Sequence, residues 1–490
     1  MKKANYIRHP NSALRGNPLV EGLGFPLSRE AIHRNCNKPF QGDLDLTDVP
    51  PDLFGYYSRS MVLNLFDVRI CQDEMVQVYE TIRQSIENGY RKRNPLDADH
   101  QRLLAAVERD KDTPLKAKNI ERLNLFGTSF SFLLCGLSGR GKTAMVNMAL
   151  EHIDQVIEHE CYTQPNQETV PFRFTQVTYI YIEHHDRRGQ KALLSAILEA
   201  IDEVTGEQYA YENRNSNITQ LMNSVRKAVI VHGIATIIFD EAQNFAPAPK
   251  DLKIGTNEKT SMKFVEQLFN TIGTSLIFVG TFSTLDLFTK EMTITRRTIR
   301  CGSLALASCS LESHFWQNLC NEILRTELLA GKGDDHELLC QHIHHLSAGI
   351  PAIAVSVVQA TLTYLTYHKP ELQTLTTSAL DYVFNKQFGL LREPIQALVN
   401  GDYHLFEDFK LMRMLEEVNP KNKTQERLDD IEAQAKDMEK QLIQKQTQLM
   451  TGRVQIIPPK PKSSPYEVDA SEVCDRMAPD NLMALLGGDS

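Results

Sequence analysis

Short apolar runs alternate with helical stretches along the middle of the chain, between about residues 120 and 310. The apolar runs are rich in β-branched and aromatic residues, which is typical of buried strands. We expect strands at 130–135, 177–182, 236–240, 275–280 and 303–308, and helices at 191–204, 218–231 and 261–271. This alternation predicts an α/β fold in which a parallel sheet is covered by helices on both faces.

The pattern differs in the N-terminal segment, residues 1–119. Residues 1 to about 65 show little periodicity and are rich in turn-forming residues, so we expect an irregular arm with turns at Pro50-Pro51 and Phe54-Gly55. Apolar side chains then recur at helical spacing over 72–90, and a second helix is expected at about 97–109.

The C-terminal part of the chain is first helical and then polar. Residues 311–402 show an all-helical pattern that indicates a small separate lobe. Residues 403–450 continue as a helical extension, whose apolar spacing fits either a short coiled coil or an amphipathic helix resting on its own body. Residues 451–490 hold a proline-rich linker and a short apolar end, so we expect a flexible tail that is either a hook for a partner protein or a disordered end.

A phosphate-binding loop lies directly after the first expected strand. The motif reads G-x-x-x-x-G-K-T, and the residues expected to hold a nucleotide are Gly136, Leu137, Ser138, Gly139, Arg140, Gly141, Lys142, Thr143 and Ala144. Glycines let backbone N–H groups wrap closely around phosphate oxygens, and the helix that follows presents its N-terminus to them. Lys142 is expected to reach the β- and γ-phosphates of ATP, and the hydroxyl of Thr143 to bind Mg²⁺.

Two acidic residues end the strand expected at 236–240. We expect Asp240 to lie near Mg²⁺ and Glu241 to orient and deprotonate the attacking water, which predicts an ATPase. Thr281 follows the next strand and is either a sensor of the γ-phosphate or a turn-forming residue. Arg296 and Arg297 suit an arginine finger offered to a neighbouring subunit, or a basic surface pair that binds carboxylates or DNA phosphate.

Two further sets of residues have competing interpretations. Arg187, Arg188 and Lys191 follow the second strand and form either a grip on DNA phosphates or a solvated loop; the lysines of 247–262 are a weaker DNA candidate. His336, Cys340 and His344 share one helical face and have the residue types of a zinc site, but the apolar residues between them explain the helix as packing.

The composition of the 490 residues, with 42% hydrophobic and 23% charged residues, is that of a soluble globular protein. No apolar run reaches the length of a membrane span, and the N-terminus lacks the apolar region of a secretory signal. Nine cysteines without CxxC spacing indicate reduced thiols, so we expect a cytoplasmic protein. The net charge of −9 means that any DNA contact comes from a local basic surface or a pore.

The order of these motifs resembles that of AAA+ ATPases, and more narrowly of TnsC, the ATP-dependent regulators of Tn-seven-like transposons, which are related to TniB and IstB. The stretches that carry the resemblance are Arg15-Gly16-Asn17-Pro18 with Glu21, Gly89-Tyr90 with Arg93-Asn94-Pro95, Ile180-Tyr181-Ile182-Glu183 through Lys191 and Ile197, and Val279-Gly280-Thr281 with Arg296-Arg297. The likeness covers roughly residues 10 to 400. One departure is Gly349-Ile350-Pro351-Ala352, which lacks the second-sensor arginine of many AAA+ proteins and puts strong intrinsic hydrolysis in doubt.

The resemblance implies an AAA+ P-loop core with a small α-helical lid, which assembles as a ring or filament on double-stranded DNA when ATP is bound. It also implies a target selector of the TnsD or TniQ type and a link to the transposase TnsA/TnsB, with selector contact assigned to 1–119 and transposase contact to 451–490. Two alternatives use the same chemistry: a signalling or defence ATPase that binds protein partners, and a replication-type helicase or clamp loader.

Overall fold

A computed structural model describes residues 2–109, 130–183, 189–245, 271–285, 300–325 and 331–399, together with positions 264, 267, 268 and 329. These residues all belong to one compact unit, Met1–Glu416. Several sequence predictions lie outside the described residues and stay predictions: the arginine pairs at 187–188 and 296–297, the lysines of 247–262, the extension at 403–450 and the tail at 451–490.

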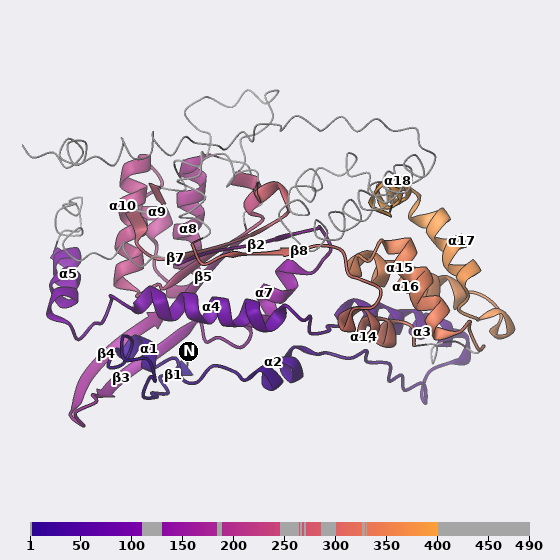
Figure 1. The fold of residues 1–490 in the computed structure, drawn as a ribbon, viewed down its shortest axis with the longest axis horizontal. Coiled ribbons are helices and arrows are strands. Elements are labelled where there is room, and N and C mark those ends of the chain that lie inside the picture. Colours follow the sequence, from indigo (N-terminus) through magenta and orange to yellow (C-terminus); the bar gives the residue numbers. More distant parts are fainter. Residues whose placement is uncertain are drawn as a thin grey trace, which may run out of the picture. The chain divides into compact units, whose positions relative to one another are not determined.

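The centre of the unit is a five-stranded parallel sheet with the order β5-β6-β7-β2-β8 (Figure 1). Its strands are β2 (Ser131–Gly136), β5 (Tyr179–Glu183), β6 (Thr236–Asp240), β7 (Ser275–Gly280) and β8 (Ser303–Leu306). Each begins and ends within two residues of the expected bounds. The prediction of a parallel sheet is therefore confirmed.

Helices cover both faces of this sheet, as the sequence pattern predicts. On one face lie α8 (Gln190–Thr205), α9 (Tyr209–Glu212) and α10 (Ile218–Val231), and on the other α4 (Met75–Tyr90) and α7 (Lys142–Leu150) (Figure 1). A hydrophobic core lies on each face of the sheet, and strand β6 contributes side chains to both. Ile237 and Phe239 pack with α8 and α10, while Ile238 packs with α4 and α7. Burial on both faces explains why the strand reads as an unbroken apolar run.

The N-terminal segment is more regular than expected. It contains α1 (Pro18–Glu21), α2 (Arg29–Cys36), η1 (Pro51–Leu53), α3 (Phe54–Val62), η2 (Leu63–Asp67) and, after α4, α5 (Ala98–Arg109). The turn expected at Phe54-Gly55 is wrong, since α3 begins there. Pro51 opens a 3₁₀ turn that leads into the helix, whose buried Met61 and Val62 pack with the C-terminal helical lobe.

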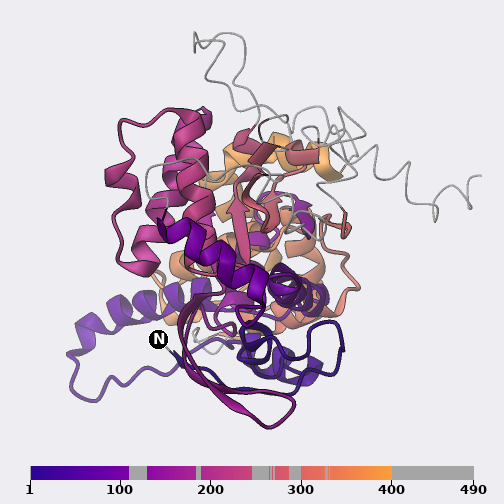
Figure 2. The same ribbon diagram turned by 90° about the vertical axis from the view of Figure 1, so that its left-hand side faces the viewer.

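A second, three-stranded sheet was not predicted. It has the order β1-β3-β4, from β1 (Lys2–Lys3), β3 (Val156–Thr163) and β4 (Thr169–Val177), and the β3–β4 hairpin curves away from the main sheet (Figure 2). Most of β4 is half-buried or exposed and β3 carries charged residues, so neither strand has the apolar run of a core strand. The hairpin is also irregular between His159 and Cys161.

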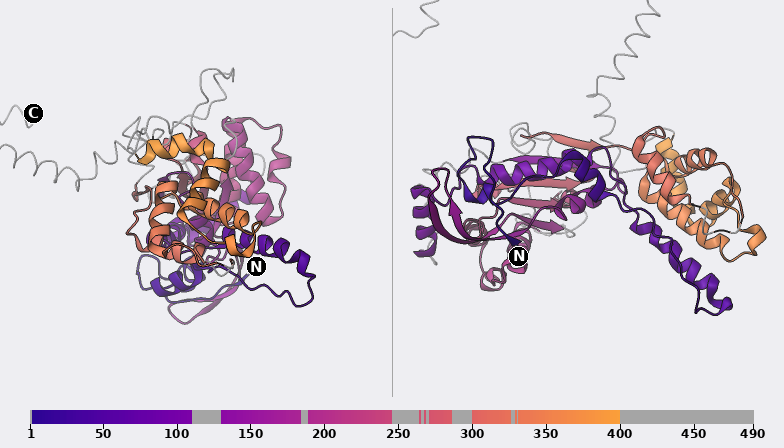
Figure 3. Two further views of the ribbon diagram at one scale, coloured as in Figure 1. Left: turned by 90° about the vertical axis from the view of Figure 1, so that its right-hand side faces the viewer. Right: turned by 90° about the horizontal axis from the view of Figure 1, so that it is seen from below.

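The C-terminal lobe is helical in its described residues (Figure 3), and it packs around a core that it shares with α3 and η2. Its elements are α14 (His314–Ile323), α15 (His336–Ser347), α16 (Pro351–Leu365), η6 (Pro370–Leu372), α17 (Thr377–Gln387), η7 (Gly389–Leu391) and α18 (Arg392–Val399). Cys340 is buried in this core, and the Nε2 of His344 lies 2.8 Å from the carbonyl of Cys309. No group of three or more potential metal ligands occurs among the described residues, and on α15 Cys340 packs in this core while His336 is exposed.

Within the described part of the chain, no single helix has the length and apolar content of a membrane span, although α15 and α16 would pass together as a pair bent by 118°.

Candidate nucleotide site

The loop between β2 and α7 forms a tight cradle. Gly139 and Gly141 have φ values of +77° and +96°, a left-handed conformation that favours glycine. A Cβ at Gly139 would lie 3.1 Å from the Cβ of Ala352 in the helical lobe, and one at Gly141 would lie 2.7 Å from the Nε2 of Gln72. Both glycines are therefore required by the backbone and by the neighbouring elements.

The lysine and threonine of the motif begin α7. Lys142 is buried, and its ammonium donates hydrogen bonds of 2.9 Å to the carbonyls of Gly136 and Leu137. The Thr143 hydroxyl donates to Oδ2 of Asp240 at 2.7 Å, across 97 residues of sequence. The structure thus brings the P-loop and the acidic end of β6 into direct contact.

Asp240 is buried and held by three donors. Besides Thr143, the Tyr181 hydroxyl donates to Oδ2 at 2.7 Å, and the backbone N–H of Glu241 donates to Oδ1 at 2.7 Å. Burial, and then the neighbouring carboxylate of Asp240, raise the pKa of Tyr181, so this phenol stays protonated as a donor. Tyr181 was not among the expected site residues, although it stands on the strand next to β6.

Glu241 and Thr281 follow adjacent strands and are connected through Gln243. The amide nitrogen of Gln243 donates to the Glu241 carboxylate, and its oxygen accepts a hydrogen bond of 3.0 Å from the Thr281 N–H. Glu241 has a φ of +55°, which is uncommon for a residue with a side chain. Gly280 leaves room for this link, since a Cβ there would lie 2.6 Å from the Gln243 oxygen.

These groups surround a cavity of about 640 Å³, which we call the nucleotide cavity. Its lining is Arg69, Ser138, Gly139, Gly141, Lys142, Thr143, Ala144, Asn147, Glu241, Gln243, Gly280, Thr281 and Ala352. Sequence analysis did not name Arg69, Asn147 and Gln243, and it named Gly280 and Ala352 without a role in binding. Asn147 and Gln243 lie a few residues beyond the motifs, whereas no motif lies near Arg69. The volume suits a small-molecule ligand of nucleotide size.

The Arg140 side chain does not line the nucleotide cavity. It is buried, and its guanidinium donates to the carbonyl of Ala307 at 2.8 Å and to the Gln72 side chain. It also pairs with Glu74 at 3.6 Å and lies 5.4 Å from the ring centroid of Phe315 in the helical lobe. Arg140 thus ties the P-loop to the N-terminal segment and to the lobe.

The residues present fit a nucleoside triphosphate with Mg²⁺. The glycine cradle and Lys142 offer donors to phosphate oxygens, while Thr143 and Asp240 offer the oxygen ligands that Mg²⁺ prefers. The lobe closes one side, because the N–H of Ala352 donates to the carbonyl of Gly139 at 3.2 Å. Of the residues expected to bind DNA, only Lys191 is described; it is exposed on α8.

Comparison with protein-family models agrees with this fold. A family model for an AAA domain matches residues 128–288, and no curated protein matches the sequence. Among solved structures, the ORC2 protein of Aeropyrum pernix in its ADPNP–ADP complexes is 12% identical, with 62% of this chain and 74% of that chain covered and a TM-score of 0.35. The ADP form of that protein is 11% identical over 58% and 67%, with a TM-score of 0.32.

At these identities and scores neither structure says what this chain binds. The parallel sheet, the P-loop and the helical lobe have the α/β fold of an AAA+ P-loop NTPase with helical additions. We call the lobe, 311–399 in its described part, the lid from here on.

Proposed function

We propose that this chain is an ATP-hydrolysing AAA+ regulator of DNA transposition. With ATP bound it assembles on double-stranded DNA, and it links a target selector of the TnsD or TniQ type to the transposase TnsA/TnsB. The proposed ATPase activity rests on one observation. Lys142, Thr143 and Glu241 line the same cavity, and the Thr143 hydroxyl donates a hydrogen bond to Asp240.

Each residue of this group has a distinct role. Lys142 leaves the two carbonyls that now accept from it and contacts the β- and γ-phosphates, while Thr143 and Asp240 hold Mg²⁺. When bound, Mg²⁺ neutralises charge on the phosphate oxygens. Glu241 accepts a proton from water as the general base, and its carboxylate is positioned by Gln243.

The two N-terminal stretches on which the resemblance to TnsC is based contact each other in the structure. The Asn17 amide donates to the carbonyl of Tyr90 at 2.8 Å, and the Asn94 amide donates to the carbonyl of Gly16 at 3.1 Å. The two N-terminal stretches that carry the resemblance therefore lie together, although more than 70 residues separate them in the sequence. Arg93 extends the contact to the sheet by donating to the carbonyl of Ile234 at 2.8 Å.

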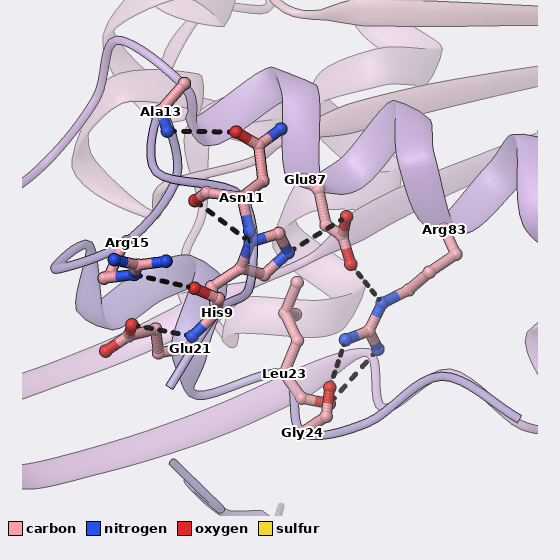
Figure 4. A network of polar contacts seen from close by, with 9 residues as sticks. All are labelled: His9, Asn11, Ala13, Arg15, Glu21, Leu23, Gly24, Arg83 and Glu87. Atoms are coloured by element: carbon pink, nitrogen blue, oxygen red, sulfur yellow. Dashed lines mark hydrogen bonds and ion pairs between the residues drawn. The ribbon is translucent and has the colours of Figure 1, made fainter. Parts of the chain in front are cut away.

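A neighbouring network holds the same segment on α4 (Figure 4). Glu87 accepts from Arg83 at 3.0 Å and pairs with His9 at 3.6 Å, and Arg83 also donates to the carbonyl of Leu23 at 3.1 Å. These contacts fasten the arm to α4. The selector contact of this arm stays a proposal.

The proposal is tested by ATP-dependent binding of the full chain to a labelled DNA duplex, measured by gel shift. Lys142→Ala should abolish the ATP-dependent shift, and Glu241→Gln should prolong it because bound ATP is no longer consumed. Lys386→Ala, a change of the same charge in the lid, is the matched control and should behave as the wild type. Equal DNA binding by all chains, with and without ATP, would refute the mechanism, and assembly that is indifferent to DNA would favour a protein-binding ATPase.

The transposase contact needs a separate experiment. A chain that ends at residue 450 should lose capture of TnsA/TnsB in a pull-down while it keeps ATP-dependent DNA binding. Capture at full strength by the shortened chain would rule out the tail as the transposase hook.

A further inference from the structure

Arg69 is a cation in the wall of the nucleotide cavity that belongs to no part of the P-loop motif. It comes from the N-terminal segment and lines the cavity together with Asn147 and the start of α7. Among the described lining residues, Lys142 and Arg69 are the two with positive charge. A cavity that receives a polyanion therefore has one cation from its motif and a second from a segment some 70 residues earlier in the sequence.

The backbone around Arg69 is held firmly. Arg69 and Lys38 exchange two backbone hydrogen bonds, of 2.9 and 2.8 Å, and the N–H of Cys71 donates to the Asn37 side chain at 2.6 Å. Gln72 then donates to the carbonyl of Arg140 in the P-loop at 3.2 Å. The segment that carries Arg69 is thus fastened to the phosphate cradle itself, which keeps its side chain beside the cavity.

The guanidinium now pairs with Glu151, at 2.6 Å between Nη1 and Oε1. Thr143 and Asn147 of α7 and its C-cap residue Glu151 follow one another at steps of four, so they share a helical face that leads from the cradle to Arg69. The side chains of Arg69 and Glu151 are 44% and 51% exposed, and an ion pair so exposed contributes little to stability. A phosphate can therefore replace Glu151 as the partner of the guanidinium with little loss of free energy.

We propose that Arg69, a residue of the N-terminal segment, contacts the bound nucleotide at the end of its phosphate chain nearer the ribose. ATP and ADP have this end of the phosphate chain in common. Lys142 and Thr143 mark the β- and γ-phosphate end of the cavity. The Arg69 guanidinium pairs with Glu151, about two helical turns beyond Thr143. A guanidinium matches phosphate oxygens with two parallel N–H donors. The inference rests on the proposed nucleotide binding and adds that the N-terminal segment responds to an occupied site.

The test is the affinity of the full chain for fluorescent ATP and ADP analogues with Mg²⁺. Arg69→Ala should weaken the binding of both nucleotides by a similar factor of roughly ten, which is the loss of affinity typical of a charge-assisted hydrogen bond. Arg69→Lys should weaken their binding less. Glu151→Gln should bind both about two- to fivefold more tightly, because the resting pair no longer competes. Arg102→Ala is the matched control, since Arg102 pairs with Asp99 at 3.0 Å and is not part of the cavity wall.

A second readout does not depend on affinity. Hydrogen exchange of the Arg69 and Lys38 amides should slow when nucleotide is added to the wild type, and should not respond in Arg69→Ala at saturating nucleotide. Equal affinities of Arg69→Ala and Arg102→Ala would overturn the inference, and so would a loss confined to ATP. If Arg69→Ala fails to fold, Arg69→Lys and Glu151→Gln decide by the same measurements. Absence of binding by the wild type would instead refute the proposed function.

Discussion

At Gly89, α4 lies close to the backbone of Ala235, which directly precedes β6. A Cβ added there would lie 3.0 Å from both C and Cα of Ala235, and nearer still to its carbonyl oxygen, whereas ordinary contact begins at 3.4 Å. The obstacle is backbone, so α4 must move away by several tenths of an ångström or more. Two contacts resist this movement: Ser85 and Thr236 share a hydrogen bond of 2.7 Å, and the Tyr90 hydroxyl donates to Val177 at 3.1 Å.

Gly89→Ala should therefore destabilise the fold, although alanine is the better helix former. Overpacking costs roughly 1–3 kcal/mol, and weakening one of the buried hydrogen bonds adds about 1 kcal/mol. The higher helix propensity of alanine offsets up to about 1 kcal/mol of this loss. The free energy of unfolding should therefore fall by roughly 2 kcal/mol.

The assay is urea unfolding of the full chain, followed by circular dichroism. Gly389→Ala is the matched control, because a Cβ there meets nothing within 4 Å, and its unfolding midpoint should stay at that of the wild type. A Gly89→Ala chain as stable as the Gly389→Ala chain would show that α4 is not pressed against the sheet in this way. In that case the glycine of the Gly89-Tyr90 stretch would need another explanation than packing.

Three further predictions concern single side chains. Gln243→Ala should slow ATP hydrolysis roughly tenfold, measured as phosphate release, and leave the ATP dissociation constant within about twofold, because Gln243 positions Glu241 rather than the phosphates. Tyr181→Phe removes one donor to the buried Asp240 and should lower the free energy of unfolding by about 1–2 kcal/mol in urea titration; an unchanged midpoint would contradict the role of this hydrogen bond. Burial lowers the pKa of His100 to about 4, below its ordinary value of 6.5, and its Nδ1 has no partner among the described residues. The unfolded chain therefore binds more protons between these values, so stability falls with pH from 6.5 toward 4, by about 2 kcal/mol at pH 5, and thermal unfolding of His100→Leu should show a correspondingly smaller decline.

The main sheet could be predicted from the sequence because its signal is local. Strands buried on both faces, such as β6 and β7, read as continuous apolar runs, and their bounds agree with those expected. The β3–β4 hairpin has one poorly buried strand and no such run. The start of α3 reads as a turn because Pro50 and Pro51 precede it and Gly55 is its second residue, and both residue types are typical of loops. A hydrophobic pattern reports whether a residue is buried, and it says little where burial is partial.

The same division holds for the site. The phosphate cradle is local chemistry, since Gly139 and Gly141 supply their positive φ values within one loop, and Lys142 and Thr143 follow directly. The sequence also marked Asp240 and Glu241 as an acidic end of a strand. Only tertiary packing decided the order of the strands. That order brings the carboxyl ends of β2, β6 and β7 together at one edge of the sheet and places Thr143 beside Asp240.

Only the tertiary structure shows that Arg69, Gln72 and Tyr181 belong to the site. Arg69 and Gln72 belong to a segment with no motif, Tyr181 had no role assigned to it within its stretch, and the contact of Gln72 with Arg140 spans 68 residues of sequence. A motif can be recognised when neighbouring residues share one function, because their spacing along the chain is preserved in the fold. A side chain that enters the site from a distant segment leaves no such spacing, and its place follows from how the helices and strands pack.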